Sequence, residues 1–234
     1  MTIRVTFLCA PGGDATVDPL LGDVPLSDLG LHRAAAAQAM LPPHELAVRA
    51  PSIRCSQTAA ALGLEAAVEP ALHDLGLGTW CGRTVDEVAA ADPHGFAAWL
   101  KDPDAAPHGG ESVRRLCRRT ANWLGSMAPD TGHTVALTEA AVVRAALIHA
   151  LGVPARAFWH LAVPPLSTVS LTLEGGCWDV RVDDVDAAPQ DDRRWPHSRP
   201  AMLVHARSDQ SASHRFGGGK RPGTPQEAAF AACR

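Results

Sequence analysis

Residues 3–14 read Ile-Arg-Val-Thr-Phe-Leu-Cys-Ala-Pro-Gly-Gly-Asp. The segment from Ile3 to Cys9 is mostly β-branched or apolar, and such a short run predicts a buried strand. The strand leads into Ala10-Pro11-Gly12-Gly13-Asp14, whose glycines and proline predict a turn. In open α/β sheets, ligands bind at the carboxyl ends of parallel strands. We therefore expect a site where this first strand ends.

Strand and helix patterns alternate along the rest of the chain, which predicts an α/β fold. Short apolar runs predict further strands at residues 46–49, 66–72, 134–138, 168–173 and 178–182. Capping residues and helical spacing predict helices from Ser27 to Pro42 and over residues 52–62, 84–100, 111–127 and 140–151. The last two strands flank Glu174-Gly175-Gly176, a hairpin signal. We expect a three-layer sandwich, with helices on both faces of a mostly parallel sheet.

Composition divides the chain into an acidic body and a basic tail. The sequence is 46% hydrophobic with a formal net charge of -4, which favours a buried core and argues against nucleic-acid or membrane partners. Residues 187–234 hold eight Lys or Arg and four Asp or Glu, giving the tail about +4 and residues 1–186 about -8. Because this tail lacks apolar periodicity, we predict one domain over residues 1–186 and a disordered basic tail over 187–234.

Six scattered cysteines predict isolated buried thiols rather than a metal site. None forms a Cys-x-x-Cys pair or a zinc-type cluster. Because no signal peptide pattern precedes them, we expect a cytoplasmic protein with reduced thiols. Cys9 is interpreted as a buried strand thiol. We expect no cofactor and no metal, and the sequence identifies no protein partner.

Two features predict an anion site at the strand ends. Arg54 follows Ser52 in the first turn of a predicted helix, where a guanidinium and helix N–H groups both favour phosphate. Gly12 and Gly13 are able to form a backbone anion nest that would bind the anion, but a simple turn is the favoured interpretation. The arginines at 114, 115, 118 and 119 are interpreted as a solvated helix face, because no aromatic residues alternate with them.

Four segments resemble conserved motifs of the histidine phosphatase superfamily, the phosphoglycerate-mutase-like proteins. They are Gly22-Asp23-Val24-Pro25-Leu26-Ser27-Asp28-Leu29-Gly30, Pro51-Ser52-Ile53-Arg54-Cys55-Ser56-Gln57-Thr58-Ala59, Gly78-Thr79-Trp80-Cys81-Gly82 and Pro107-His108-Gly109-Gly110-Glu111-Ser112. The resemblance covers residues 3 to about 182, keeps the family's order and implies a phosphoglycerate-mutase-like fold.

The resemblance fails at the positions that carry the family's chemistry. Members use an Arg-His-Gly motif, whose His is phosphorylated, and a later Ser-His-Gly motif. Here Ala10 and Pro11 stand in place of the first Arg-His pair, and Glu139 stands in place of the second His. Arg54 matches a phosphate-binding arginine, and Asp74 stands where the family has an acidic proton donor. Proline supplies no nucleophile, so the resemblance implies that the phosphohistidine route is closed.

These departures leave two functional hypotheses. The first is a catalytically degenerate protein with a binding or regulatory role, in which Arg54 and Glu139 pair and a small anion binds weakly. The second is an active hydrolase or phosphatase of a small phosphorylated metabolite. It would use a relocated histidine, His73 or His108, or the carboxylates of Asp74 and Glu139 as acid and base. Five tryptophans are assigned to core or rim packing: Trp80, Trp99, Trp123, Trp159 and Trp178.

Overall fold

The computed structural model describes residues 2–12, 21–130 and 132–183. A six-stranded sheet forms its centre, in the order β3-β2-β4-β1-β5-β6. The strands are β1 Thr2–Cys9, β2 Leu46–Arg49, β3 Ala67–Val68, β4 His133–Thr138, β5 Thr168–Glu174 and β6 Cys177–Asp183. Four of them, β3, β2, β4 and β1, run parallel, whereas β5 and β6 form the predicted antiparallel hairpin.

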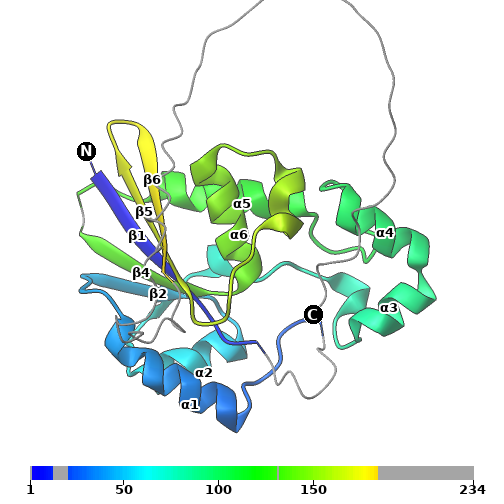
Figure 1. The fold of residues 1–234 in the computed structure, drawn as a ribbon, viewed down its shortest axis with the longest axis horizontal. Coiled ribbons are helices and arrows are strands. Elements are labelled where there is room, and N and C mark those ends of the chain that lie inside the picture. Colours follow the sequence, from blue (N-terminus) through cyan, green and yellow to red (C-terminus); the bar gives the residue numbers. More distant parts are fainter. Residues whose placement is uncertain (1, 13–20, 131, 184–234) are drawn as a thin grey trace, which may run out of the picture.

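Helices cover both faces of the sheet, which confirms the predicted three-layer arrangement (Figure 1). The helices are α1 Asp28–Ala36, α2 Ile53–Leu62, α3 Val85–Ala91, α4 Pro93–Lys101, α5 Val113–Ser126 and α6 Ala140–Leu151. In Figure 1, α1 and α2 lie on one side of the sheet, and α5 and α6 lie on the other. Single 3₁₀ turns occupy Ala37–Met40, Pro70–Leu72, Gly78–Trp80 and Ala155–His160.

The predicted helix over residues 84–100 is two helices. Asp92 ends α3, and Pro93 starts α4 at its first position, where a missing N–H costs nothing. The Asp92 side chain accepts a hydrogen bond from Gly95 N at 2.8 Å and so caps the second helix. The predicted strand over 66–72 is also shorter, because Pro70 opens a 3₁₀ turn. This turn carries the chain directly toward Asp74.

The register of the parallel strands brings three strand ends together. Cys9 lies opposite Thr138 in the β1–β4 pair, and Ala10 N donates to Thr138 O at 2.8 Å. On the other side of β4, Ala50 N donates to Leu137 O at 2.9 Å. The segments that follow β1, β4 and β2 therefore leave the same edge of the sheet side by side, as the sequence predicted.

The structure tests the predicted burial of some cysteines but does not test the predictions that concern residues outside the described ranges. The predicted tail over 187–234, Gly13 and Asp14, and Cys233 all lie outside the described residues. Cys9 and Cys55 are buried as expected, but Cys81, in a surface turn, and Cys177, at the start of the edge strand β6, are exposed. Within the described ranges, no helix is long and apolar enough to cross a membrane.

Candidate functional site

A cavity of about 210 Å³ opens at the edge where β1, β4 and β2 end. It is lined by Leu21, Arg54, Asp74, Leu75, Leu77, Trp99, Glu139, Ala140, Ala141, Arg144, Phe158 and Trp159. Three of the residues predicted from the sequence, Arg54, Asp74 and Glu139, thus come together in one cavity. They come from the start of α2, the loop after Pro70–Leu72 and the residue that precedes α6.

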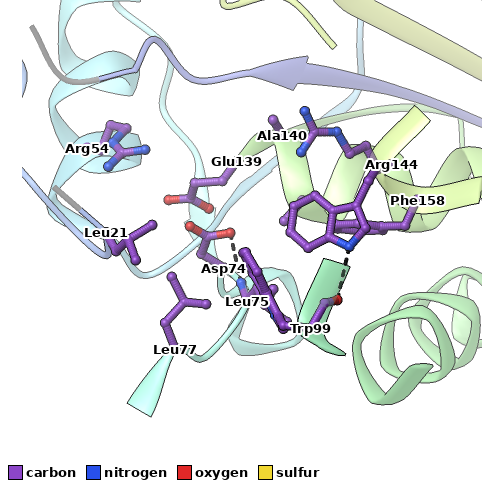
Figure 2. A pocket seen from close by; sticks show the side chains of 12 residues that line it. Leu21, Arg54, Asp74, Leu75, Leu77, Trp99, Glu139, Ala140, Arg144 and Phe158 are labelled. Atoms are coloured by element: carbon purple, nitrogen blue, oxygen red, sulfur yellow. Dashed lines mark hydrogen bonds between the residues drawn. The ribbon is translucent and has the colours of Figure 1, made fainter. Parts of the chain in front are cut away.

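The carboxyl groups of Asp74 and Glu139 point toward each other in the middle of the cavity (Figure 2). Arg54 lies on one side of this pair and Arg144 on the other. The cavity therefore holds two carboxyl groups between two guanidinium groups. Such a pair is a candidate for acid–base chemistry, because neighbouring carboxyl groups drive their protonation equilibria apart.

Asp74 is the member of the pair whose pKa is clearly raised. Burial and the nearby Glu139 charge raise the pKa of Asp74 from 3.8 to about 7. Opposing effects come from the Leu75 N–H, which donates to Asp74 Oδ1 at 2.8 Å, and from the charges of Arg54 and Arg119. Near neutral pH, Asp74 is accordingly poised to gain or lose a proton.

Glu139 is buried, with 4% of its surface exposed. Its Oε1 lies 3.5 Å from the Cys55 thiol, and its Oε2 lies 3.4 Å from the Thr138 hydroxyl. Glu139 is the N-cap residue of α6, but its side chain makes no capping bond. Instead it turns into the cavity, where the positive end of the helix favours its charge.

Arg54 and Glu139 do not form the predicted ion pair. One guanidinium nitrogen of Arg54 donates to the carbonyl oxygen of Gly22 at 2.9 Å, and its buried Nε has no partner among the described residues. The first turn of α2 is also filled, because the Asp23 carboxylate accepts from Ile53 N at 2.8 Å and Arg54 N at 3.3 Å. The helix N–H groups are therefore occupied, and anion binding would depend on the Arg54 guanidinium.

Arg144 is the cavity residue that the sequence analysis missed. It comes from α6, its Nε donates to Leu161 O at 2.9 Å, and its guanidinium lies 5.7 Å from the centre of the Phe158 ring. Burial lowers the pKa of Arg144 below its ordinary value. The sequence did contain a signal, because Arg144 is the single Arg or Lys in segment 140–151, whose other residues apart from His149 are apolar.

Residues 10–12, which were predicted to replace part of the family's first motif, do not line the cavity. Ala10 and Pro11 are buried, Gly12 is exposed, and none of the three lines the cavity. Gly12 needs no glycine-specific backbone angle, since its φ lies outside the left-handed region. Burial raises the pKa of Cys9 to about 12, so its thiol remains protonated and is a poor nucleophile.

The two relocated histidines are also outside the cavity. His73 Nδ1 lies 2.7 Å from the carbonyl oxygen of Asp74. His108, a loop residue, is only 1% exposed. Its ring packs against Trp80 and Trp99, its Nδ1 accepts from Gly110 N at 3.0 Å, and burial lowers its pKa. His108 is therefore a neutral core residue, because the glycine loop folds inward.

Asp74 is held in place by contacts behind the cavity. Arg119 donates to the carbonyl oxygens of Ala71 at 2.6 Å and Asp74 at 3.4 Å. The same guanidinium forms an ion pair with Glu111 at 2.7 Å, with side chains only 18% and 14% exposed. Arg119 was predicted to face solvent, but these contacts turn it inward. The Thr138 hydroxyl adds a 2.8 Å bond to Leu72 O.

The raised pKa of Asp74 predicts a pH-dependent stability. Between about 3.8 and about 7 the folded protein binds a proton that the unfolded chain releases, so the free energy of unfolding falls as pH rises. Asp74→Asn removes the titrating group, so we expect the stability of the variant relative to the parent to rise by about 4 kcal/mol between about pH 4 and pH 7. Urea unfolding across the pH range measures the difference. A constant difference at all pH values would contradict it.

The described residues of this site do not form a metal centre. Over residues 2–12, 21–130 and 132–183, no group of three or more His, Cys, Asp or Glu side chains is placed to hold a metal ion. The chemistry available to the described cavity is that of two carboxyl groups and two guanidinium groups. These groups transfer protons and bind anions.

Comparison with known proteins decides the family. Residues 21–184 match the model of the histidine phosphatase superfamily, branch 1. The chain belongs to this superfamily. The family match begins after Cys9 to Asp14, the segment that the sequence analysis compared with the family's first motif.

Curated relatives in this family are phosphatases. Glucosyl-3-phosphoglycerate phosphatase of Mycobacterium tuberculosis is 31% identical over 163 residues, covering 58% of this chain and 73% of the relative. That of Mycolicibacterium vanbaalenii is 41% identical over 96 residues, covering 38% of this chain and 43% of the relative. The latter match therefore spans less than half of that relative.

Solved structures of the family share the fold. The native structure of mycobacterial glucosyl-3-phosphoglycerate phosphatase has a TM-score of 0.67 and 25% identity, covering 78% of this chain and 98% of its own. The likeness confirms the predicted phosphoglycerate-mutase-like fold. The central sheet and its flanking helices thus belong to a scaffold on which phosphatases are built.

Proposed function

We propose that this protein hydrolyses a small phosphate monoester with water as the nucleophile, using Asp74 as general acid and Glu139 as general base. The observation that carries the proposal is the facing pair of carboxyl groups between Arg54 and Arg144. The phosphatase names of the relatives support the reaction class. Their phosphohistidine chemistry is not available at Pro11, which offers neither a nucleophile nor an N–H donor.

The charges of the cavity suit a phosphate monoanion. When Asp74 is protonated, two guanidinium groups face one carboxylate, which leaves one net positive charge. When Asp74 ionises near its pKa of about 7, the net charge becomes zero. Since each charge-assisted hydrogen bond to phosphate contributes about 1.5–3 kcal/mol, we expect binding to weaken as pH rises through this range.

The proposed reaction uses one water and conserves all protons. Glu139 accepts a proton from the water as its oxygen attacks phosphorus, and the bond between phosphorus and the ester oxygen breaks. Asp74 donates its proton to the leaving oxygen, giving an alcohol and inorganic phosphate. Glu139 is then protonated and Asp74 ionised, and proton exchange between the facing groups or with solvent restores the starting state.

Hydrolysis in heavy-oxygen water tests the mechanism. At about pH 6, below the pKa of Asp74, we expect steady turnover of p-nitrophenyl phosphate with one water oxygen incorporated into the released phosphate. No initial burst of nitrophenol should precede it, because no phosphoenzyme forms. Arg54→Ala should raise KM, whereas Arg115→Ala, on the exposed face of α5, serves as control. A stoichiometric burst would contradict the mechanism, and absence of turnover would contradict hydrolysis.

The second candidate is a catalytically degenerate protein with a binding role. It is favoured by the residues themselves, because Ala10, Pro11 and Glu139 replace groups of the family's reaction. The same experiment separates the two candidates. Stabilisation by vanadate or inorganic phosphate, lost in Arg54→Ala, together with no turnover in the parent protein, would favour the binding role.

A further inference from the structure

The wall of the cavity beyond the four charged residues is apolar. It is formed by Leu21, Leu75, Leu77, Trp99, Phe158 and Trp159, with Ala140 and Ala141 at the start of α6. The indole N–H of Trp159 donates to the carbonyl oxygen of Trp99 at 3.3 Å, whereas the buried indole N–H of Trp99 has no hydrogen-bond partner among the described residues. Among the lining residues, the charged side chains are concentrated at one end. The remaining wall offers mainly apolar surface.

Trp159 is held rigidly in this wall. Its ring centre lies 4.3 Å from that of Trp99 and 4.8 Å from that of Phe158, both in edge-to-face contact. Trp99 continues the packing to Trp80, whose ring centre is 5.3 Å away. Phe158 and Trp99 are 1% and 6% exposed, whereas Trp159 is only partly buried. Trp159 thus presents a fixed, accessible indole surface to a ligand.

We propose that Trp159 selects a phosphate monoester whose organic group is a single aromatic ring, and this inference rests on the proposed function. With the phosphate between Arg54 and Arg144, the ring would rest against the indole, where aromatic contacts add to the burial of apolar surface. A polyol ester would place hydroxyl groups against apolar side chains, where unpaired polar groups are costly. The cavity of about 210 Å³ also favours a small organic group.

The sequence predicts core or rim packing for Trp159. The structure shows that Trp159 also lines the cavity. The sequence around it, Ala155–His160, forms a 3₁₀ turn that follows α6 after Gly152. This turn brings Phe158 and Trp159 into the cavity wall that Leu75 and Leu77 also line. Selection by this residue is therefore separable from phosphate binding, which depends on the guanidinium groups.

Two phosphonates that cannot be hydrolysed test the selection by calorimetry. Benzylphosphonate carries a ring, whereas 3-hydroxypropylphosphonate carries a flexible polar chain on the same head group. We expect the parent protein to bind benzylphosphonate at least about tenfold more tightly. Trp159→Leu keeps an apolar side chain but lacks the planar surface, and should reduce the preference to about twofold or less. Trp159→Ala should do the same.

Trp178→Leu is the matched control, because Trp178 is also partly buried but lies on β6 outside the cavity wall. It should keep the full preference, and circular dichroism confirms folding of each variant. Equal binding of the two phosphonates, binding of neither, or a preference that survives in folded Trp159→Leu would overturn the inference. Turnover of phenyl phosphate is measured separately. Selective binding without turnover would refute the proposed hydrolysis but not the selection.

Discussion

Asp74→Asn is expected to lower kcat for hydrolysis of a small phosphate monoester by about 10²- to 10⁴-fold, the usual contribution of a general acid. Asparagine has nearly the same shape, and its amide oxygen can still accept from Leu75 N, as Asp74 Oδ1 does at 2.8 Å. The variant removes the transferable proton and leaves the two arginines in place. KM at about pH 6 should therefore change much less than kcat.

The pH profile gives this prediction a second readout. Because burial and the Glu139 charge raise the pKa of Asp74 to about 7, the general acid is protonated below this pH and lost above it. Activity of the parent protein should fall as pH rises through about 7, and the residual activity of Asp74→Asn should lack this fall. Asp104→Asn is the control, since Asp104 is an exposed partner of Arg114. An active Asp74→Asn variant with an unchanged profile would exclude Asp74 as the acid.

The position of the site could be predicted because it follows from strand order. A short apolar strand at Ile3–Cys9 and another at Thr134–Thr138 were sufficient to predict that their carboxyl ends meet. The register of β1 and β4 places Cys9 beside Thr138 and therefore brings Ala10 next to Glu139. The helix cap could also be predicted, because capping depends only on neighbouring residues. The Ser52 hydroxyl, just before α2, accepts a hydrogen bond from Cys55 N at 3.1 Å.

The pairing within the site could not be predicted, because it depends on side-chain directions and distant segments. Arg54 was expected to meet Glu139, but its guanidinium turns to the carbonyl of Gly22, a residue 32 positions away. Arg144 was missed because helical spacing alone does not tell which side of α6 faces the end of the sheet. The burial of His108 could not be predicted either, because it depends on how the glycine loop folds.

Arg119→Met is expected to reduce the free energy of unfolding by about 3 kcal/mol, because removal of one partner leaves a buried charge uncompensated. Arg119 forms bonds to both carboxylate oxygens of Glu111, at 3.1 and 2.7 Å, and also donates to Ala71 O and Asp74 O. Methionine fills part of the space with a flexible apolar chain and makes none of these bonds. Chemical denaturation at about pH 6 measures the loss.

Arg114→Met is the matched control on the same helix. Arg114 forms an ion pair with Asp104 at 2.6 Å, but the two side chains are 54% and 58% exposed, so the loss should remain below about 1 kcal/mol. Equal losses in the two variants would show that burial of the Arg119–Glu111 pair contributes nothing. Because Arg119 also holds the main chain of Asp74, the folded Arg119→Met variant should lose kcat as well. Arg114→Met should keep it, which connects the stability of this ion pair to the placement of the proposed general acid.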